Sequence, residues 1–215
     1  MKLVHSVRRW ARNKNDFYIE PEWCSRRLFE TEKFRGHIHD PCAGTGRILT
    51  EARLAGYRAS GHDINPRHPD VMARDFMTID FNIDNIVCNP PFSIARKFTE
   101  LAIDCSIFKC ALILPTVWLN GDKRSRWLET TPLYKILLLT PRPSMPPGEV
   151  VMAGEAARNG TQDFAWFIWS RGHTGPAQIG WLRRDGSPAM KQADGRGPTL
   201  SDSASGPASL QGLSL

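Results

Sequence analysis

The residues best suited to chemistry are Asn89-Pro90-Pro91-Phe92, which follow the apolar run Ile86-Val87-Cys88. β-Branched residues favour a buried strand, and the prolines end it because neither has a backbone N–H to donate. The prolines also stiffen the turn, so its carbonyl oxygens point in set directions. Such a turn offers an amide oxygen, a backbone carbonyl and an aromatic ring, which suit a planar group bearing an NH2. Asn and Pro are also frequent in ordinary turns, so a plain loop is the alternative interpretation.

A glycine turn upstream favours a functional interpretation. Residues 38–40 are typical of a strand, Gly44-Thr45-Gly46 of a tight turn, and the residues from Arg47 to about Ala55 of a helix. Strand, turn and helix form the first unit of a doubly wound sheet, which binds ligands at the carboxyl ends of its strands. The turn lacks the third glycine of the dinucleotide fingerprint and the Lys-Ser/Thr ending of a P-loop. With Asp40 in front of it, the turn favours a cationic ligand over a pyrophosphate.

Further acids follow in the positions that a nucleoside ligand would need. Asp63 ends the next expected strand, roughly twenty residues after the glycine turn, where a carboxylate can accept hydrogen bonds from ribose hydroxyls. Asp75 next to Phe76 could hold an adenine ring, although this pair alone is a weak signal. His62 and His68 have no spacing that indicates a metal site, so we expect ordinary surface or loop histidines.

The elements that must position these residues alternate between strand and helix. We predict a doubly wound, Rossmann-like α/β fold with a mostly parallel sheet of seven strands. The seventh, at 164–169, follows its predecessor without a helix and should therefore pair antiparallel. We expect a basic N-terminal segment at 1–16, one domain at 17–170 with a long mobile loop at 141–163, and a largely disordered, low-complexity tail at 171–215, in which 178–182 could form one more short strand.

The composition narrows the class of protein. The chain has 215 residues, enough for one core, and its net charge of +6 favours a polyanionic partner. It contains no apolar run long enough to span a membrane and no secretory signal at its N-terminus, so we expect a cytoplasmic protein. Its five cysteines include no CxxC pair, which favours buried thiols over disulfides or a metal site.

Together the two motifs resemble those of class I S-adenosylmethionine-dependent amino-methyltransferases, and most closely those of DNA adenine methyltransferases, including small phage-type ones. The resemblance covers roughly residues 17–170. Residues 40–46 match the family's cofactor motif and 89–92 its catalytic tetrad. Phe17 to Trp23 resemble an additional cofactor motif, in which Glu20-Pro21 stands in place of the usual Thr-Pro.

The resemblance implies S-adenosylmethionine as cofactor, DNA as the leading nucleic-acid partner and no metal. The substrate amino group would bind to Asn89 and the carbonyl of Pro90, with the flipped base stacked on Phe92. The implied catalytic residues are Asn89, Pro90, Pro91 and Phe92. The implied cofactor residues are Tyr18, Pro21, Asp40, Cys42, Gly44, Gly46, Asp63, Ile64, Asp75, Phe76 and Asn89.

Other substrates fit the same tetrad. Enzymes that methylate amino groups of RNA bases or the glutamine amide of proteins carry it too, and a non-catalytic nucleic-acid-binding module with this fold is a further alternative. Methylation at carbon 5 of cytosine is disfavoured, because no Pro-Cys lies in the catalytic turn. We also expect the loop at 141–163, through Arg142 and Arg158, to close over the target strand.

Overall fold

A computed structural model of the chain describes residues 16–154 and 160–187. The expected basic segment therefore lies outside the described residues except for Asp16, and so do Arg158 and most of the expected tail. The strands are β1 (Ile38–Asp40), β2 (Ala59–Asp63), β3 (Val71–Ala73), β4 (Ile83–Cys88), β5 (Ser106–Pro115), β6 (Leu133–Thr140), β7 (Phe164–Ser170) and β8 (Gln178–Arg183). The helices are α1 (Glu22–Thr31), α2 (Arg47–Leu54), α3 (Ala95–Cys105), α4 (Asp122–Glu129) and α5 (Gly148–Met152), with 3-10 turns η1 (Phe76–Thr78) and η2 (Thr116–Asn120).

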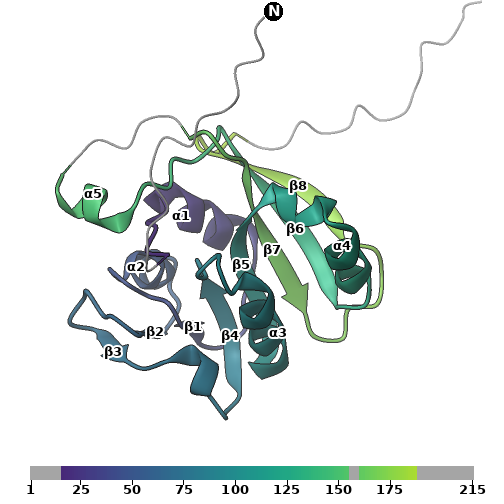
Figure 1. Ribbon diagram of the computed structural model, residues 1–215, viewed down its shortest axis with the longest axis horizontal. Helices are drawn as coiled ribbons and strands as arrows, with labels where there is room; N and C mark the ends of the chain where they lie inside the picture. Colours follow the sequence, from purple (N-terminus) through teal and green to yellow (C-terminus); the bar gives the residue numbers. More distant parts are fainter. Residues whose placement is uncertain (1–15, 155–159, 188–215) are drawn as a thin grey trace, which may run out of the picture.

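All eight of these strands form one sheet in the order β3-β2-β1-β4-β5-β7-β6-β8 (Figure 1). Strand β7 pairs antiparallel with both β5 and β6, and the other pairings are parallel. The doubly wound α/β fold and its antiparallel seventh strand are therefore confirmed. The sheet has one strand more than the seven predicted, because 178–183 pair in parallel with β6 along the edge that it would otherwise expose.

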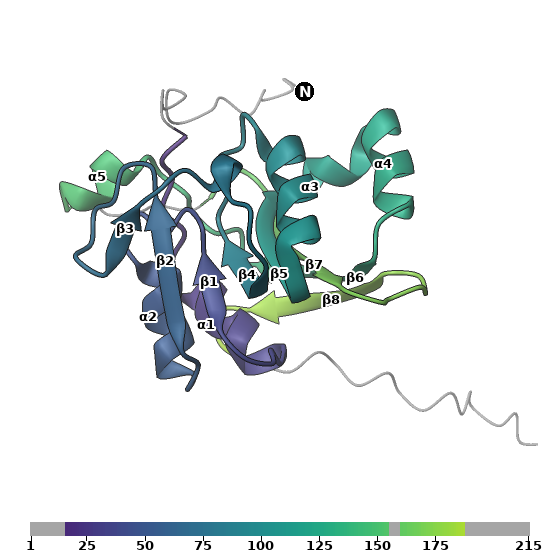
Figure 2. The ribbon, with the colours of Figure 1, turned by 90° about the horizontal axis from the view of Figure 1, so that it is seen from below.

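Two helical layers cover the two faces of the sheet (Figure 2). Since side chains alternate along a strand, neighbouring residues enter different cores. Val87 packs in the cluster that includes Leu28 of α1 and Ile48 of α2, whereas Ile86 packs in the cluster with Phe98 of α3. The central strands are buried on both faces, which explains why they read as apolar runs without alternation.

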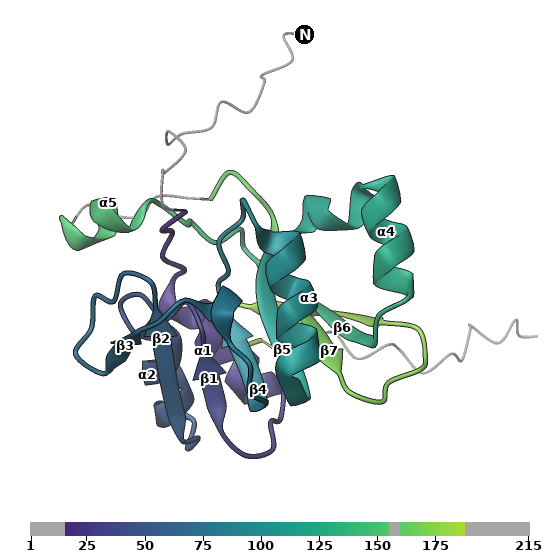
Figure 3. The same cartoon turned by 60° about the horizontal axis from the view of Figure 1, so that its bottom comes forward.

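Helix α5 lies far from α4, on the other side of the molecule (Figure 3). It belongs to the segment 141–163, which we expected to be a mobile loop. Residues 146–148 of this segment pair with the chain before α1: Ile19 N–H donates to the Pro146 carbonyl at 3.3 Å, and Gly148 N–H to the Phe17 carbonyl at 2.8 Å. This part of the segment is therefore fixed to the residues that lead into α1.

Candidate active site

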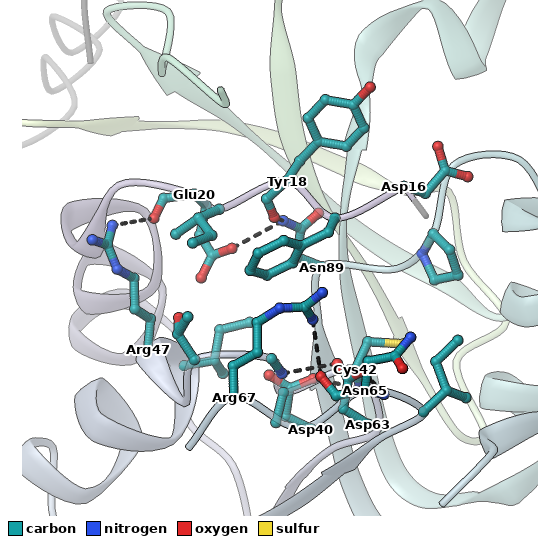
Figure 4. A pocket seen from close by; sticks show the side chains of 18 residues that line it. Asp16, Tyr18, Glu20, Asp40, Cys42, Arg47, Asp63, Asn65, Arg67 and Asn89 are labelled. Atoms are coloured by element: carbon teal, nitrogen blue, oxygen red, sulfur yellow. Dashed lines mark hydrogen bonds between the residues drawn. The ribbon is translucent and has the colours of Figure 1, made fainter. Parts of the chain in front are cut away.

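A hollow of about 670 Å3, counted with its open mouth, lies at the carboxyl ends of β1, β2 and β4 (Figure 4). Four segments line it: Asp16–Glu20 before α1, the turn between β1 and α2, the residues after β2, and the turn after β4. Its place is where doubly wound sheets bind ligands. The predicted residues that line it are Tyr18, Asp40, Cys42, Gly44, Asp63, Ile64, Asn89 and Pro91.

Backbone N–H groups and two carboxylates shape the glycine turn. Cys42 N–H donates to Asp40 Oδ1 at 3.0 Å, and Gly44 N–H donates to Asp63 Oδ2 at 2.9 Å. Gly44 has a φ of +47° and Gly46 a φ of +76°, a region that favours glycine. A Cβ on Gly44 would also lie 3.3 Å from the Phe17 ring, so glycine keeps this wall of the hollow open.

The hollow has an acidic floor. Asp40 is 2% exposed. Burial is the main cause that raises its pKa well above the ordinary value, and the negative charges of Glu20 and Asp63 raise it further, while the Cys42 N–H opposes the shift. The carboxylates of Asp16, Glu20, Asp40 and Asp63 line the hollow beside the guanidinium groups of Arg47 and Arg67. A ligand that brings positive charge to Asp40 would offset the cost of ionising it.

The turn after β4 presents the amide of Asn89 in one orientation (Figure 4). Asn89 Nδ2 donates to the Tyr18 carbonyl and to Glu20 Oε2, each at 2.9 Å. Asn89 Oδ1 is buried and has no hydrogen-bond partner among the described residues. Because a carbonyl and a carboxylate only accept hydrogen bonds, this network assigns the amino end of the amide toward them and leaves Oδ1 as an unused acceptor.

Glu20 is a site residue that the sequence analysis missed. It is 5% exposed, and burial raises its pKa to about 6 against the lowering effects of its own backbone N–H, Asn89 and Arg47. Arg47 supplies the positive charge that lowers the pKa of Glu20. It lies on α2, and its guanidinium N–H donates to the Glu20 carbonyl at 3.0 Å. The sequence did carry a signal for Glu20: it stands before Pro21, where the additional cofactor motif of the similar family usually has Thr.

Aromatic rings pack behind the catalytic turn. Phe92 stacks on Tyr18 with ring centroids 5.8 Å apart and lies 5.9 Å from Phe164. Phe92 and the buried Pro90 do not line the hollow, whereas Pro91 does. Tyr18, which the resemblance assigns to the cofactor, both lines the hollow and stacks on a residue of the predicted tetrad.

Four other predicted cofactor residues lie outside the lining of the hollow. Pro21 and Gly46 precede the first residues of α1 and α2. Asp75 is exposed, and its Oδ1 accepts from Met77 N–H at 2.9 Å as the cap of η1. Phe76 is buried, with its ring centroid 4.6 Å from that of Phe98. The turn η1 thus uses both side chains for its own structure.

Two arginines outside the glycine turn have partners within the protein. Arg67 lies over the Phe17 ring at 3.6 Å from its centroid. Arg142, which we expected to approach a target strand, forms two hydrogen bonds to the Asp163 carboxylate at 2.6 and 3.2 Å. The closing of residues 141–163 over a substrate stays a prediction, with Arg142 already engaged at the base of the segment.

Two observations bear on metals and membranes. Within residues 16–154 and 160–187, no group of three His, Cys, Asp or Glu side chains could hold a metal ion, and no helix has the length and apolar character to cross a membrane. The five cysteines are free thiols, four of them buried. The expectation of an exposed His62 was wrong, because its ring is buried and contacts His39.

Comparison with known proteins identifies the fold. No family model and no curated protein sequence matches the chain. The EcoKI M protein of a type I restriction enzyme matches with a TM-score of 0.53 and 14% identity, over 80% of this chain and 49% of that one. A modification subunit of a type I restriction enzyme from Vibrio vulnificus YJ016 matches with a TM-score of 0.52 and 15% identity, over 77% and 46%. The chain therefore has the class I S-adenosylmethionine-dependent methyltransferase fold, and it spans about half the length of these structures.

Proposed function

We propose that this protein transfers a methyl group from S-adenosylmethionine to an exocyclic amino nitrogen, and that adenine in DNA is its substrate. The observation that carries the proposal is the unused acceptor Asn89 Oδ1 in the turn that closes the hollow. An amino group can donate a hydrogen bond to this oxygen, whereas a carbonyl or phosphate oxygen cannot.

The hollow fits the charge of the proposed cofactor. S-adenosylmethionine carries a sulfonium and an ammonium, and the buried carboxyl of Asp40 has no cation within hydrogen-bonding distance among the described residues. Gly44 provides backbone at the wall where a Cβ would meet Phe17. Asp40 would hold the ammonium, and Asp63, whose oxygens accept from Gly44 and Asn65 N–H groups, would use its remaining lone pairs for the ribose.

The adenine of the cofactor would extend toward Ile64, which is 64% exposed at the edge of the hollow. Asp75 and Phe76 stay the proposed contacts of this ring. Since neither side chain lines the hollow and Asp75 caps η1, these two assignments require a change in the segment around η1 when the cofactor binds.

The protein's own part in the reaction is positioning. The bound cofactor supplies an electrophilic methyl group on its sulfonium. Asn89 Oδ1 and the Pro90 carbonyl would accept hydrogen bonds from the two N–H groups of the substrate amine, which orients the nitrogen lone pair and stabilises the charge that develops on the nitrogen. Phe92 stays the proposed stacking partner of a flipped base, and its ring is held in place by Tyr18 and Phe164.

DNA is favoured over other substrates by the motif resemblance and by charge. The net charge of +6 favours a polyanion, which a protein glutamine substrate is not. RNA amino groups fit the same tetrad and are the second candidate. A non-catalytic module is disfavoured, since it would gain nothing from a buried acceptor left without a partner.

Transfer of labelled methyl from S-adenosylmethionine tests this proposal. Unmethylated DNA, total RNA and a protein extract are offered in parallel to the wild type, to Asn89→Ala and to Asn82→Ala, an exposed control before β4. We expect label in DNA as methyladenine, lost in Asn89→Ala and kept in Asn82→Ala, and calorimetry with the cofactor separates a loss of transfer from a loss of cofactor binding. Label found only in RNA or only in protein would mean that DNA is not the substrate, and no label in any fraction would refute the proposed activity.

A further inference from the structure

The two ends of the Asn89 amide have opposite surroundings. Both N–H groups of Nδ2 are used, one by the Tyr18 carbonyl and one by Glu20 Oε2, whereas Oδ1 has no partner among the described residues. If the amide turned by half a rotation, Oδ1 would face two acceptors and both hydrogen bonds would be lost. The orientation of Asn89 is therefore set by its neighbours and not by the turn alone.

Of these two neighbours, only Glu20 can change its hydrogen-bonding character. A backbone carbonyl accepts in every state, but a carboxyl accepts when ionised and can also donate when protonated. We propose that Glu20 is a positioning residue for methyl transfer, whose carboxylate holds the Asn89 amide so that Oδ1 receives the substrate amine. This inference rests on the proposed function, and it assigns to Glu20 a role that acts through Asn89.

Burial and the groups around Glu20 decide when it is ionised. Asn89 faces it from the turn after β4, Arg47 from α2, Asp40 from β1 and Cys24 from α1. Burial has the largest effect and raises the pKa of Glu20 to about 6, although Asn89 and Arg47 favour the ionised form. Glu20 is thus mostly ionised at neutral pH and becomes protonated in mild acid.

Protonation would leave only the Tyr18 carbonyl to favour one end of the amide over the other. A protonated Glu20 can donate to Asn89 Oδ1, and this pairing turns the Nδ2 hydrogens toward the site of the substrate amine. Two donors would then face each other, which is unfavourable. Methyl transfer should consequently fall below about pH 6.

Exchanging the two side-chain types provides a sharp test. In Glu20→Gln, either end of the amide pair can donate, so only the Tyr18 carbonyl still favours the observed orientation. In Asn89→Asp, two carboxyls lie side by side and compete for one proton. In the double variant Glu20→Gln/Asn89→Asp, the glutamine N–H can donate to one aspartate oxygen and leave the other as an acceptor for the amine.

We expect each single variant to reduce kcat at least tenfold, and the double variant to recover at least tenfold over Asn89→Asp. Glu20→Gln should also lose the fall in kcat near pH 6. The matched control is Glu22→Gln, an exposed acid two residues away, which should neither change kcat nor rescue Asn89→Asp. A Glu20→Gln enzyme with the wild-type rate and pH profile, and a double variant no better than Asn89→Asp, would overturn the inference.

A measurement on the wild-type protein, without cofactor, does not depend on whether the variants fold. In 15N spectra of the wild-type protein, the side-chain NH2 signals of Asn89 should shift as Glu20 titrates between about pH 5 and pH 8. Signals that do not move would overturn the inference even if methyl transfer is observed. If the signals move but no substrate is methylated, the coupling of Glu20 to Asn89 stands and the proposed function fails.

Discussion

Acid should destabilise this protein through a buried histidine next to Asp40. His39 is 7% exposed, and its ring nitrogens lie 2.8 Å from His62 Nδ1 and 3.0 Å from Ser60 Oγ. Burial is the main cause that lowers the pKa of His39 to about 3, and the positive charges of His62, His37 and Arg74 lower it further. The folded protein therefore holds a neutral imidazole at pH values where the unfolded chain carries a cation.

The direction of the effect follows from the two pKa values. Because the unfolded pKa of 6.5 is above the folded value of about 3, the unfolded state binds the extra proton between them. Above about pH 6.5, His39 is neutral in both states and costs no stability. As the pH falls from 6.5 toward 3, only the unfolded state takes up the proton, and the free energy of unfolding decreases. At about pH 5, the unfolded state gains ~2 kcal/mol from this one group, since each pH unit below 6.5 is worth about 1.4 kcal/mol.

Urea unfolding at about pH 7.5 and about pH 5 measures this effect in the wild type and in His39→Gln. The variant loses ring contacts and should be less stable at the higher pH, but it lacks the titrating group. Its free energy of unfolding should therefore fall by ~2 kcal/mol less than that of the wild type between the two pH values. An equal fall in both proteins would refute a neutral, buried His39.

This result also bears on the test of Glu20. A loss of ~2 kcal/mol is a large share of the stability of a typical domain. Activity near pH 5 must therefore be measured in parallel with the folded fraction, so that a change in the Asn89 amide is separated from unfolding.

Three further variants test the site and the core. Asp40→Asn removes a buried carboxyl whose pKa is raised, so the variant should gain stability relative to the wild type as the pH rises from about 5 to 8, as seen by thermal unfolding, while calorimetry shows at least tenfold weaker cofactor binding. A Cβ on Gly61 would lie 2.7 Å from the Asp40 carbonyl oxygen, so Gly61→Ala should cost about 1–3 kcal/mol in urea unfolding, whereas Gly175→Ala, with its nearest contact at 3.4 Å, should cost less. Trp166 is 0% exposed and its Nε1 donates to the Cys24 carbonyl at 3.0 Å; Trp166→Phe should cost about 2–4 kcal/mol, and a cost below 1 kcal/mol would contradict the packing of this ring.

The sequence by itself was sufficient for the architecture and for the two turns of the site. Pro90 and Pro91 must end a strand, and the glycines at 44 and 46 take positive φ values that other residues rarely adopt. The antiparallel seventh strand followed from the lack of a helical pattern in the sequence between 140 and 164, where the described residues form the five-residue helix α5. These features depend on residues close together in the chain, so a local pattern reports them.

Only the tertiary structure decided which side chains meet. Glu20 and Asn89 are 69 residues apart, and neither local pattern predicts their hydrogen bond. Phe76 is a candidate stacking partner in the sequence, and only the structure shows that its ring packs against Phe98 in the core. The burial of His62 and the pairing of β8 with β6 likewise depend on neighbours brought in from distant segments. A sequence shows which groups are available, but partners and burial, which fix pKa values and amide orientation, arise when the chain folds.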